Sequence, residues 1–125
     1  MLLYLETISD TTKIITFSNQ LDELNRKEWK TNRNQTDELL VEIDKIIKSN
    51  KKQIDGVFVN TNFGPYTSVR IGLTVVNFLA LALNIQPVGV GSVSEICFRD
   101  RQEFREMLVP MYQNSPVITK KKNRL

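Results

Sequence analysis

Residues 55–83 read DGVFVNTNFGPYTSVRIGLTVVNFLALAL, and this stretch decides the fold of the chain. It consists of an apolar run, a turn that contains Gly64 and Pro65, and a long apolar segment that Arg70 enters near its start. The pattern predicts a buried strand, a tight loop and a buried helix. In α/β proteins such a unit is a common place for a ligand or a partner, so the loop and the helix are the first candidates for a functional site.

The helix expected over residues 67–83 has two different sides. One side is apolar or small and is expected to face the sheet, and Gly72 on it allows a close backbone approach. Its residues are Val69, Gly72, Val76, Leu79 and Leu83. The other side of the helix is also mostly apolar but carries a narrow polar strip, because Arg70, Thr74 and Asn77 follow one another at helical spacing.

The residues before this stretch predict three strands and a helix. The apolar runs at residues 2–7 and 13–17 predict a hairpin, and the more polar residues 24–31 predict a third strand at the edge of the sheet. Residues 36–49 carry leucine and isoleucine at helical spacing, which predicts an amphipathic helix.

After the central stretch, residues 88–90 predict another short buried strand. Residues 92–98 and 101–108 predict helical turns or short helices, and residues 109–112 predict the start of a further strand. The resulting order, βββαβαβα, predicts an α/β fold with a mixed sheet. This is the topology of a single lobe of the actin, sugar-kinase and Hsp70 superfamily, which is ribonuclease H-like.

The composition indicates one globular domain. The chain has 125 residues, of which 41% are hydrophobic and 25% are charged. A single cysteine, Cys97, excludes an internal disulfide, and no secretory signal or membrane span is recognised, so we expect a cytoplasmic protein. Basic residues at 120–124 account for the net charge of +3. We expect residues 1–112 to form the lobe and residues 113–125 a disordered basic tail, with RNA binding by the tail as a weaker alternative.

The sequence contains no histidine. Within these residues this excludes histidine metal sites, Ser-His-Asp triads and Cys-His pairs, and a single cysteine excludes thiolate metal clusters. Glu6 and Asp10 are acids that can hold a metal-bound water, but two acids near a turn are more often solvated or capping residues. We therefore predict no catalytic residue, no metal site and no cofactor.

Four blocks of the sequence resemble the bacterial TsaB (YeaZ-like) proteins of tRNA threonylcarbamoyl-adenosine biosynthesis. Residues 3–7, LYLET, place Glu6 at the acidic position of the family's opening IDTS strand, and residues 33–37, RNQTD, resemble its RNHSQ-like helix start. Residues 62–72, NFGPYTSVRIG, resemble GPGSFTGLRIG, and residues 79–96, LALALNIQPVGVGSVSEI, resemble GLALALNIPLVGVSSLEAL. Family members continue into a second lobe, so the resemblance implies a reduced, single-lobe relative.

The loop departs from the family pattern. Asn62, Phe63, Pro65 and Ser68 stand where the family has Gly, Pro, Ser and Gly, respectively. A phosphate cradle needs backbone N–H groups that approach the anion closely, whereas Pro65 has no N–H and Phe63 adds bulk. We interpret this segment as a degenerate phosphate-type loop, with the residues Asn62, Gly64, Thr67 and Ser68.

The resemblance implies a non-catalytic subunit. TsaB proteins pair with the catalytic protein TsaD, which attaches the threonylcarbamoyl group to tRNA adenosine and uses metal-binding histidines. They do so through two helices that correspond to residues 36–49 and 67–83. We therefore expect a TsaD-like partner, or a second copy of this chain, on these helices, with only indirect contact to tRNA. The predicted interface residues are Leu40, Ile43, Ile47, Arg70, Leu73, Thr74, Asn77 and Leu81.

The residues themselves also favour a partner. A single lobe with two apolar helices, one of them hydrophobic almost all round, leaves an exposed apolar patch of the kind associated with assembly. Three alternative roles are open for Arg70. It lies at the rim of an interface, it forms an internal salt bridge to Glu6 or to an acid of the first helix, or it binds an anion. The alternative function is a small enzyme that binds a nucleotide or phosphate at residues 62–68.

Overall fold

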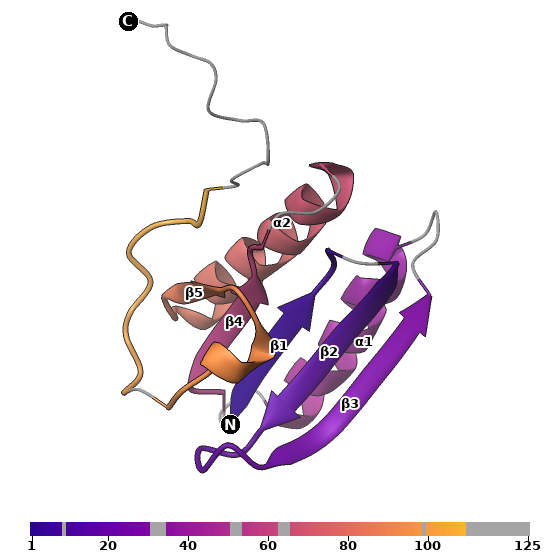
Figure 1. Ribbon diagram of the computed structural model, residues 1–125. Coiled ribbons are helices and arrows are strands. Elements are labelled where there is room, and N and C mark those ends of the chain that lie inside the picture. Colours follow the sequence, from indigo (N-terminus) through magenta and orange to yellow (C-terminus); the bar gives the residue numbers. More distant parts are fainter. Residues whose placement is uncertain (9, 31–34, 51–53, 63–65, 99, 110–125) are drawn as a thin grey trace, which may run out of the picture.

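A mixed five-stranded sheet lies at the centre of the described part of the chain (Figure 1). The computed structural model describes residues 1–8, 10–30, 35–50, 54–62, 66–98 and 100–109. The elements in chain order are β1 (Leu2–Glu6), β2 (Thr11–Phe17), β3 (Glu23–Lys30), α1 (Gln35–Asn50), β4 (Gly56–Asn60), α2 (Tyr66–Leu83), β5 (Pro87–Val90) and the 3-10 turn η2 (Val93–Glu95).

The strands follow the order β3-β2-β1-β4-β5. The first three form an antiparallel meander, whereas β4 runs parallel to β1 and β5 runs parallel to β4. Antiparallel strands join through short turns, but parallel strands need a crossover, which α2 supplies between β4 and β5. The predicted α/β fold with a mixed sheet is therefore confirmed, and so is the edge position of the third strand.

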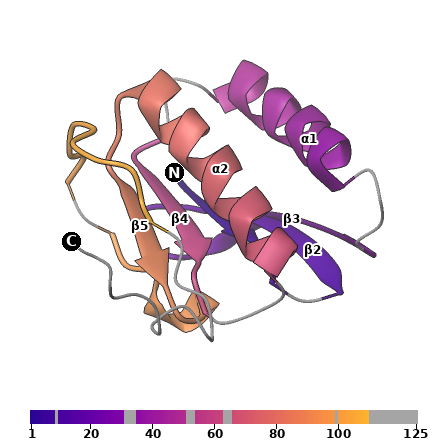
Figure 2. The same ribbon diagram turned by 90° about the horizontal axis from the view of Figure 1, so that it is seen from above.

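Both helices lie on the same face of the sheet, while η2 lies on the opposite face (Figures 1 and 2). α1 has Asp37 and Glu38 in its first turn and Lys48 in its last turn, which are the charges that suit the helix dipole. Within the described residues, neither helix combines the length and the hydrophobicity that a bilayer-spanning helix requires.

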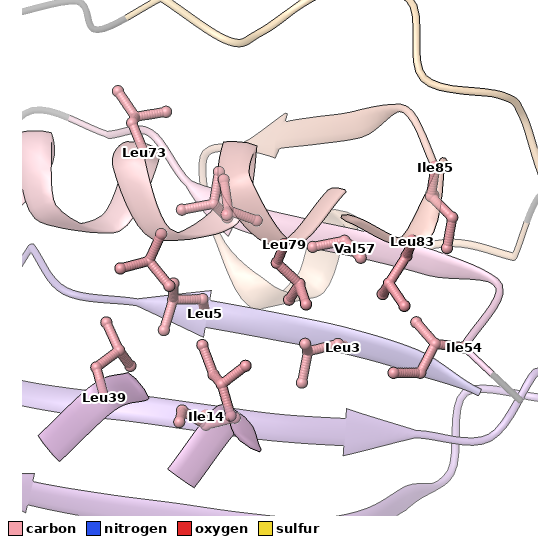
Figure 3. Packing of buried hydrophobic residues seen from close by; sticks show 14 of the residues in the cluster. Leu3, Leu5, Ile14, Leu39, Ile54, Val57, Leu73, Leu79, Leu83 and Ile85 are labelled. Carbon is pink, nitrogen blue, oxygen red and sulfur yellow. The ribbon is translucent and has the colours of Figure 1, made fainter. Parts of the chain in front are cut away.

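The main hydrophobic core fills the space between the helices and this face of the sheet (Figure 3). Alternate residues of a strand point to opposite faces, so Leu3 and Leu5 of β1 reach this core while Leu2 and Tyr4 belong to a second cluster on the other face. The labelled side chains of the main core are Leu3, Leu5, Ile14, Leu39, Ile54, Val57, Leu73, Leu79, Leu83 and Ile85.

Contacts at both ends fix α2 on the sheet. At its start, the Thr7 hydroxyl Oγ1 donates a hydrogen bond of 2.7 Å to the carbonyl oxygen of Ser68. Gly72 faces the same threonine, and a Cβ at this position would lie 2.4 Å from Thr7 Oγ1. The close approach predicted at Gly72 is confirmed. After the last turn, Asn84 adopts a left-handed conformation with φ of 56°, which is a usual way to end a helix.

The predicted helix at residues 101–108 is wrong. This segment has no helical residues, and the only helical structure described after β5 is the single turn η2. Side-chain amides that precede it in the chain bind its backbone in this non-helical conformation, as described below. Val109 is also outside any strand, and residues 110–112 of the predicted last strand, like the basic segment at residues 113–125, lie outside the described residues.

Candidate partner interface

An apolar groove separates α1 from α2 on the solvent side of the lobe. It has a volume of about 370 Å³ and is nearly all hydrocarbon, with one carboxylate at its border. We call it the α1–α2 groove; it is lined by Leu40, Ile43, Asp44, Ile47, Val75, Phe78, Leu79 and Ala82. Three of the predicted interface residues, Leu40, Ile43 and Ile47, thus line one continuous surface.

Large apolar side chains stand at the exposed rim of this groove. Of the residues that line it, Leu40 of α1 is 50% exposed and Phe78 of α2 is 73% exposed. Leu81 is not a lining residue, but it is 52% exposed and lies next to Phe78, three residues further along α2. Single exposed apolar residues are common, but several of them around one hydrophobic depression indicate an interaction site. Sequence reasoning missed Phe78, although its position four residues after Thr74 places it on the same exposed stripe of α2.

The exposed stripe of α2 contains some of the predicted residues and excludes others. Arg70, Thr74 and Leu81 are exposed, as an interface requires. Leu73 is only 3% exposed and belongs to the main core. The stripe passes through Phe78 at i+8 from Arg70, and not through Asn77 at i+7. The predicted partner contact of Leu73 is therefore corrected, because its side chain is already packed inside the lobe.

Asn77 is also turned inward. Its side chain is 8% exposed, its Nδ2 donates to the carbonyl oxygen of Leu108 at 3.0 Å, and its Oδ1 accepts from the Leu108 N–H at 2.8 Å. The amide group has thus found its hydrogen-bond partner within the chain. Asn77, predicted as an interface residue, thus uses its side chain for contacts within its own chain.

The carboxyl ends of β1, β4 and β5 are the usual ligand position of an open α/β sheet. Here this edge carries an internal hydrogen-bond network. The Tyr4 hydroxyl donates to Glu6 Oε1 and accepts from Asn60 Nδ2 at 3.0 Å, while Lys13 Nζ lies 3.6 Å from Glu6 Oε2. Burial, together with the hydrogen bond to Glu6, raises the pKa of the Tyr4 phenol far above its usual range, and the hydrogen bond from Asn60 opposes this in part.

Glu6, the acid predicted at the end of the first strand, is therefore already bound by Tyr4 and close to Lys13. Asp10 lies elsewhere, exposed, and accepts a hydrogen bond from Thr11. Within the described residues, no group of three or more acidic, cysteine or histidine side chains is placed to hold a metal ion.

Only the borders of the predicted phosphate-type loop are described. Asn62 Nδ2 donates to the carbonyl oxygen of Gly91 at 3.4 Å, and the Asn62 N–H donates to Asn60 Oδ1 at 2.8 Å. The carbonyl of Ser68 accepts from Thr7. Gly64 and the side chain of Thr67 lie outside the described residues. The described contacts of the loop borders are structural ones, to the neighbouring strands.

A protein-family model described as TsaD: tRNA N6-adenosine threonylcarbamoyltransferase matches residues 29–112. The chain belongs to this family. The match includes α1, α2 and the segment that follows β5, so all parts of the α1–α2 groove lie in the matched region of the TsaD family. A search of curated proteins found no match.

Two solved structures resemble this TsaD-family chain. One is "YeaZ from Pseudomonas aeruginosa" and the other is an uncharacterized protein with similarity to peptidase YeaZ, also from Pseudomonas aeruginosa. Each superposes with a TM-score of 0.61 and 23% identity, over 71% of this chain and 42% of the other. The likeness shows that the chain has the fold of part of these YeaZ structures, as predicted for a single lobe of this kind. The chain spans less than half the length of these structures.

Proposed function

We propose that the chain is a non-catalytic subunit in tRNA threonylcarbamoyl-adenosine modification that binds and stabilises a TsaD-like catalytic protein. The observation that carries this proposal is the α1–α2 groove with its exposed residues Leu40 and Phe78, together with the neighbouring exposed Leu81. The family match supports a role in tRNA threonylcarbamoyl-adenosine modification, and the groove supports a role in binding a partner protein.

The groove suits a helical partner. Helices pack by placing the side-chain ridges of one into the grooves of another, and an apolar furrow between two neighbouring helices accepts such a ridge. Phe78 stands at the rim as a large aromatic anchor, the type of residue that often dominates binding energy. Asp44 borders the groove and forms a salt bridge of 3.0 Å with Lys48, so the apolar surface has a charged pair at one edge, which favours a single orientation of the partner.

The chemistry of the chain supports a role without catalysis. Glu6, at the acidic position of the first strand, is bound by Tyr4 and has Lys13 close by. A carboxylate with these partners is poorly suited to collect a metal ion, because a hydrogen-bond donor and a cation already satisfy its oxygens. The 125 residues contain no histidine, whereas the resemblance to TsaD implies histidine ligands in the catalytic protein.

The experiment that tests the proposal is complex formation with the histidine-containing TsaD-like protein of the same organism. Phe78→Glu and Leu81→Glu place a charge on the rim and are expected to weaken the complex by about thirtyfold or more, the effect of losing one hot-spot residue. Leu24→Glu is the matched control, since Leu24 is 57% exposed but lies on β3, away from the groove.

Light scattering of the mixed proteins gives the mass of the complex, and circular dichroism checks that each variant is folded. The proposal predicts a complex for the wild type and for Leu24→Glu, and free chains for the two groove variants. It is wrong if no complex forms, or if the groove variants bind as well as the wild type. A dimer of this chain that the same two variants dissociate would make a second copy, and not a TsaD-like protein, the occupant of the groove.

A further inference from the structure

Residues 101–108, RQEFREML, are not helical although their sequence favours a helix. Arginine, glutamine, glutamate, methionine and leucine are all good helix formers, and Phe104 and Leu108 stand four residues apart, a spacing that supports an isolated helix. No residue of this segment is helical in the structure. A conflict between local preference and observed conformation is unusual in natural proteins and often marks a functional element.

Amide side chains hold the segment in its non-helical conformation by binding its backbone. Besides Asn77, which binds both backbone groups of Leu108, Gln86 contributes most: its Oε1 accepts from the N–H groups of Arg105 at 2.7 Å and Glu106 at 3.1 Å, and its Nε2 donates to the carbonyl oxygen of Glu106 at 3.1 Å. A third amide, that of Asn84, accepts from the N–H of Phe104 at 3.2 Å. We call residues 101–108 the strap.

Arg101 anchors the first residue of the strap to the end of α2. Its guanidinium donates to the carbonyl oxygen of Leu83 at 2.6 Å and to that of Ile54 at 2.7 Å. A cation at the C-terminus of a helix is favoured by the helix dipole. The strap thus starts at the end of α2 and runs back along this helix to Asn77, on the side away from α1 (Figure 2).

The strap contributes little to the hydrophobic core. Phe104 and Leu108 are half-buried, while the other strap residues are exposed. Its attachment therefore depends mainly on a set of polar contacts, each with a modest net contribution to stability. Segments with few buried apolar contacts open locally at a lower free energy than the whole domain.

We infer that residues 101–108 are a two-state element, a non-helical strap when bound to the amides of Asn77, Asn84 and Gln86 and an α-helix when released. The release uncovers the Asn77 amide and the flank of α2 that faces away from α1. This flank is separate from the α1–α2 groove, so the inference stands independently of the proposed partner.

Position 107 offers a matched pair of variants. The Met107 side chain is exposed, and within the described residues its N–H makes no hydrogen bond. Proline at this position is therefore compatible with the strap but disrupts a helix, whereas alanine removes the same side chain and favours the helix. Neither substitution touches the amides that hold the strap.

The experiment measures Cα chemical shifts and amide exchange of residues 101–108 in the full chain. Asn77→Ala is combined with either Met107→Ala or Met107→Pro. Loss of two hydrogen bonds is expected to speed exchange of the Leu108 amide by about tenfold or more. Helical shifts are expected in Asn77→Ala/Met107→Ala and not in Asn77→Ala/Met107→Pro, while Met107→Pro alone keeps the strap.

Two results would overturn the inference. Random-coil shifts in Asn77→Ala/Met107→Ala would mean that the released segment is not helical. Unchanged protection of the Leu108 amide in Asn77→Ala would mean that the amides do not hold the strap. If Asn77→Ala does not fold, Gln86→Ala takes its place, because Gln86 is half-exposed and binds the strap at Arg105 and Glu106.

Discussion

Replacing Gly72 by alanine tests how α2 is seated on the sheet. The new Cβ would lie 2.4 Å from Thr7 Oγ1 and 3.6 Å from both Thr7 Cβ and Thr7 Cγ2. Thr7 is 1% exposed and cannot turn into solvent. To make room, its side chain has to rotate and give up the hydrogen bond of 2.7 Å to the carbonyl of Ser68, or the helix has to move away from β1.

The size of the effect follows from three opposing contributions. Alanine in place of glycine inside a helix stabilises by about 1 kcal/mol. Loss of the buried hydrogen bond costs about 1 kcal/mol, and overpacking of a close contact costs about 1–3 kcal/mol. We therefore expect Gly72→Ala to lower the free energy of unfolding by about 1–3 kcal/mol.

A double-mutant cycle with Thr7→Ala isolates the contact. Thr7→Ala removes both Oγ1 and Cγ2, so Gly72→Ala in that background should be neutral or stabilising, with a coupling energy above about 1 kcal/mol. Urea unfolding of the four proteins, followed by circular dichroism, gives the required free energies. Equal effects of Gly72→Ala in both backgrounds would refute the contact between α2 and Thr7.

Three further predictions concern other parts of the molecule. The pKa of Tyr4 is raised in the folded state, so its contribution to stability is complete below the unfolded-state pKa of about 10 and is lost as the pH rises above it. Tyr4→Phe should therefore lose stability less steeply than the wild type above about pH 10. Urea midpoints with the same pH dependence in both proteins would contradict this. Leu21 has a left-handed φ of 72° and is exposed, so Leu21→Asn should raise the free energy of unfolding by about 0.5–1 kcal/mol, and a loss in urea unfolding would count against the strain. Titration calorimetry with ATP, ADP or phosphate should give no binding heat. Measurable binding that Ser68→Ala weakens and that a proline-free loop variant, Pro65→Gly, strengthens would favour the alternative of a nucleotide- or phosphate-binding enzyme.

Strands and long helices could be predicted from the sequence because their patterns are local. The apolar run of β1, the helical spacing of Leu39 and Ile43, and the small residue Gly72 on the sheet side of α2 can all be recognised directly in the residue order. The structure confirms each of them. The C-terminal segment could not be predicted in this way, because contacts with Asn77 and Gln86, distant in sequence, override the helix preference of residues 101–108.

Only part of the candidate interface could be predicted from the sequence, for a similar reason. Residue spacing gives the angle of a side chain around α2 but not the angle at which the exposed face begins. Asn77 and Phe78 are neighbours in sequence, and only the packing of the strap shows that Asn77 is covered while Phe78 is exposed. For the same reason the glutamate substitutions that test assembly belong at Phe78 and Leu81, whereas a glutamate at Leu73 would unfold the core.

The most direct test of the partner interface is methyl NMR of this chain, labelled at leucine, with the unlabelled TsaD-like protein added. The methyl signals of Leu40, in the α1–α2 groove, and of Leu81, next to Phe78 on α2, are expected to shift and to lose their exposure to a soluble paramagnetic probe. The methyl groups of Leu24 on β3 should keep theirs. Unchanged signals of Leu40 and Leu81 in a complex whose mass shows both proteins bound would contradict it.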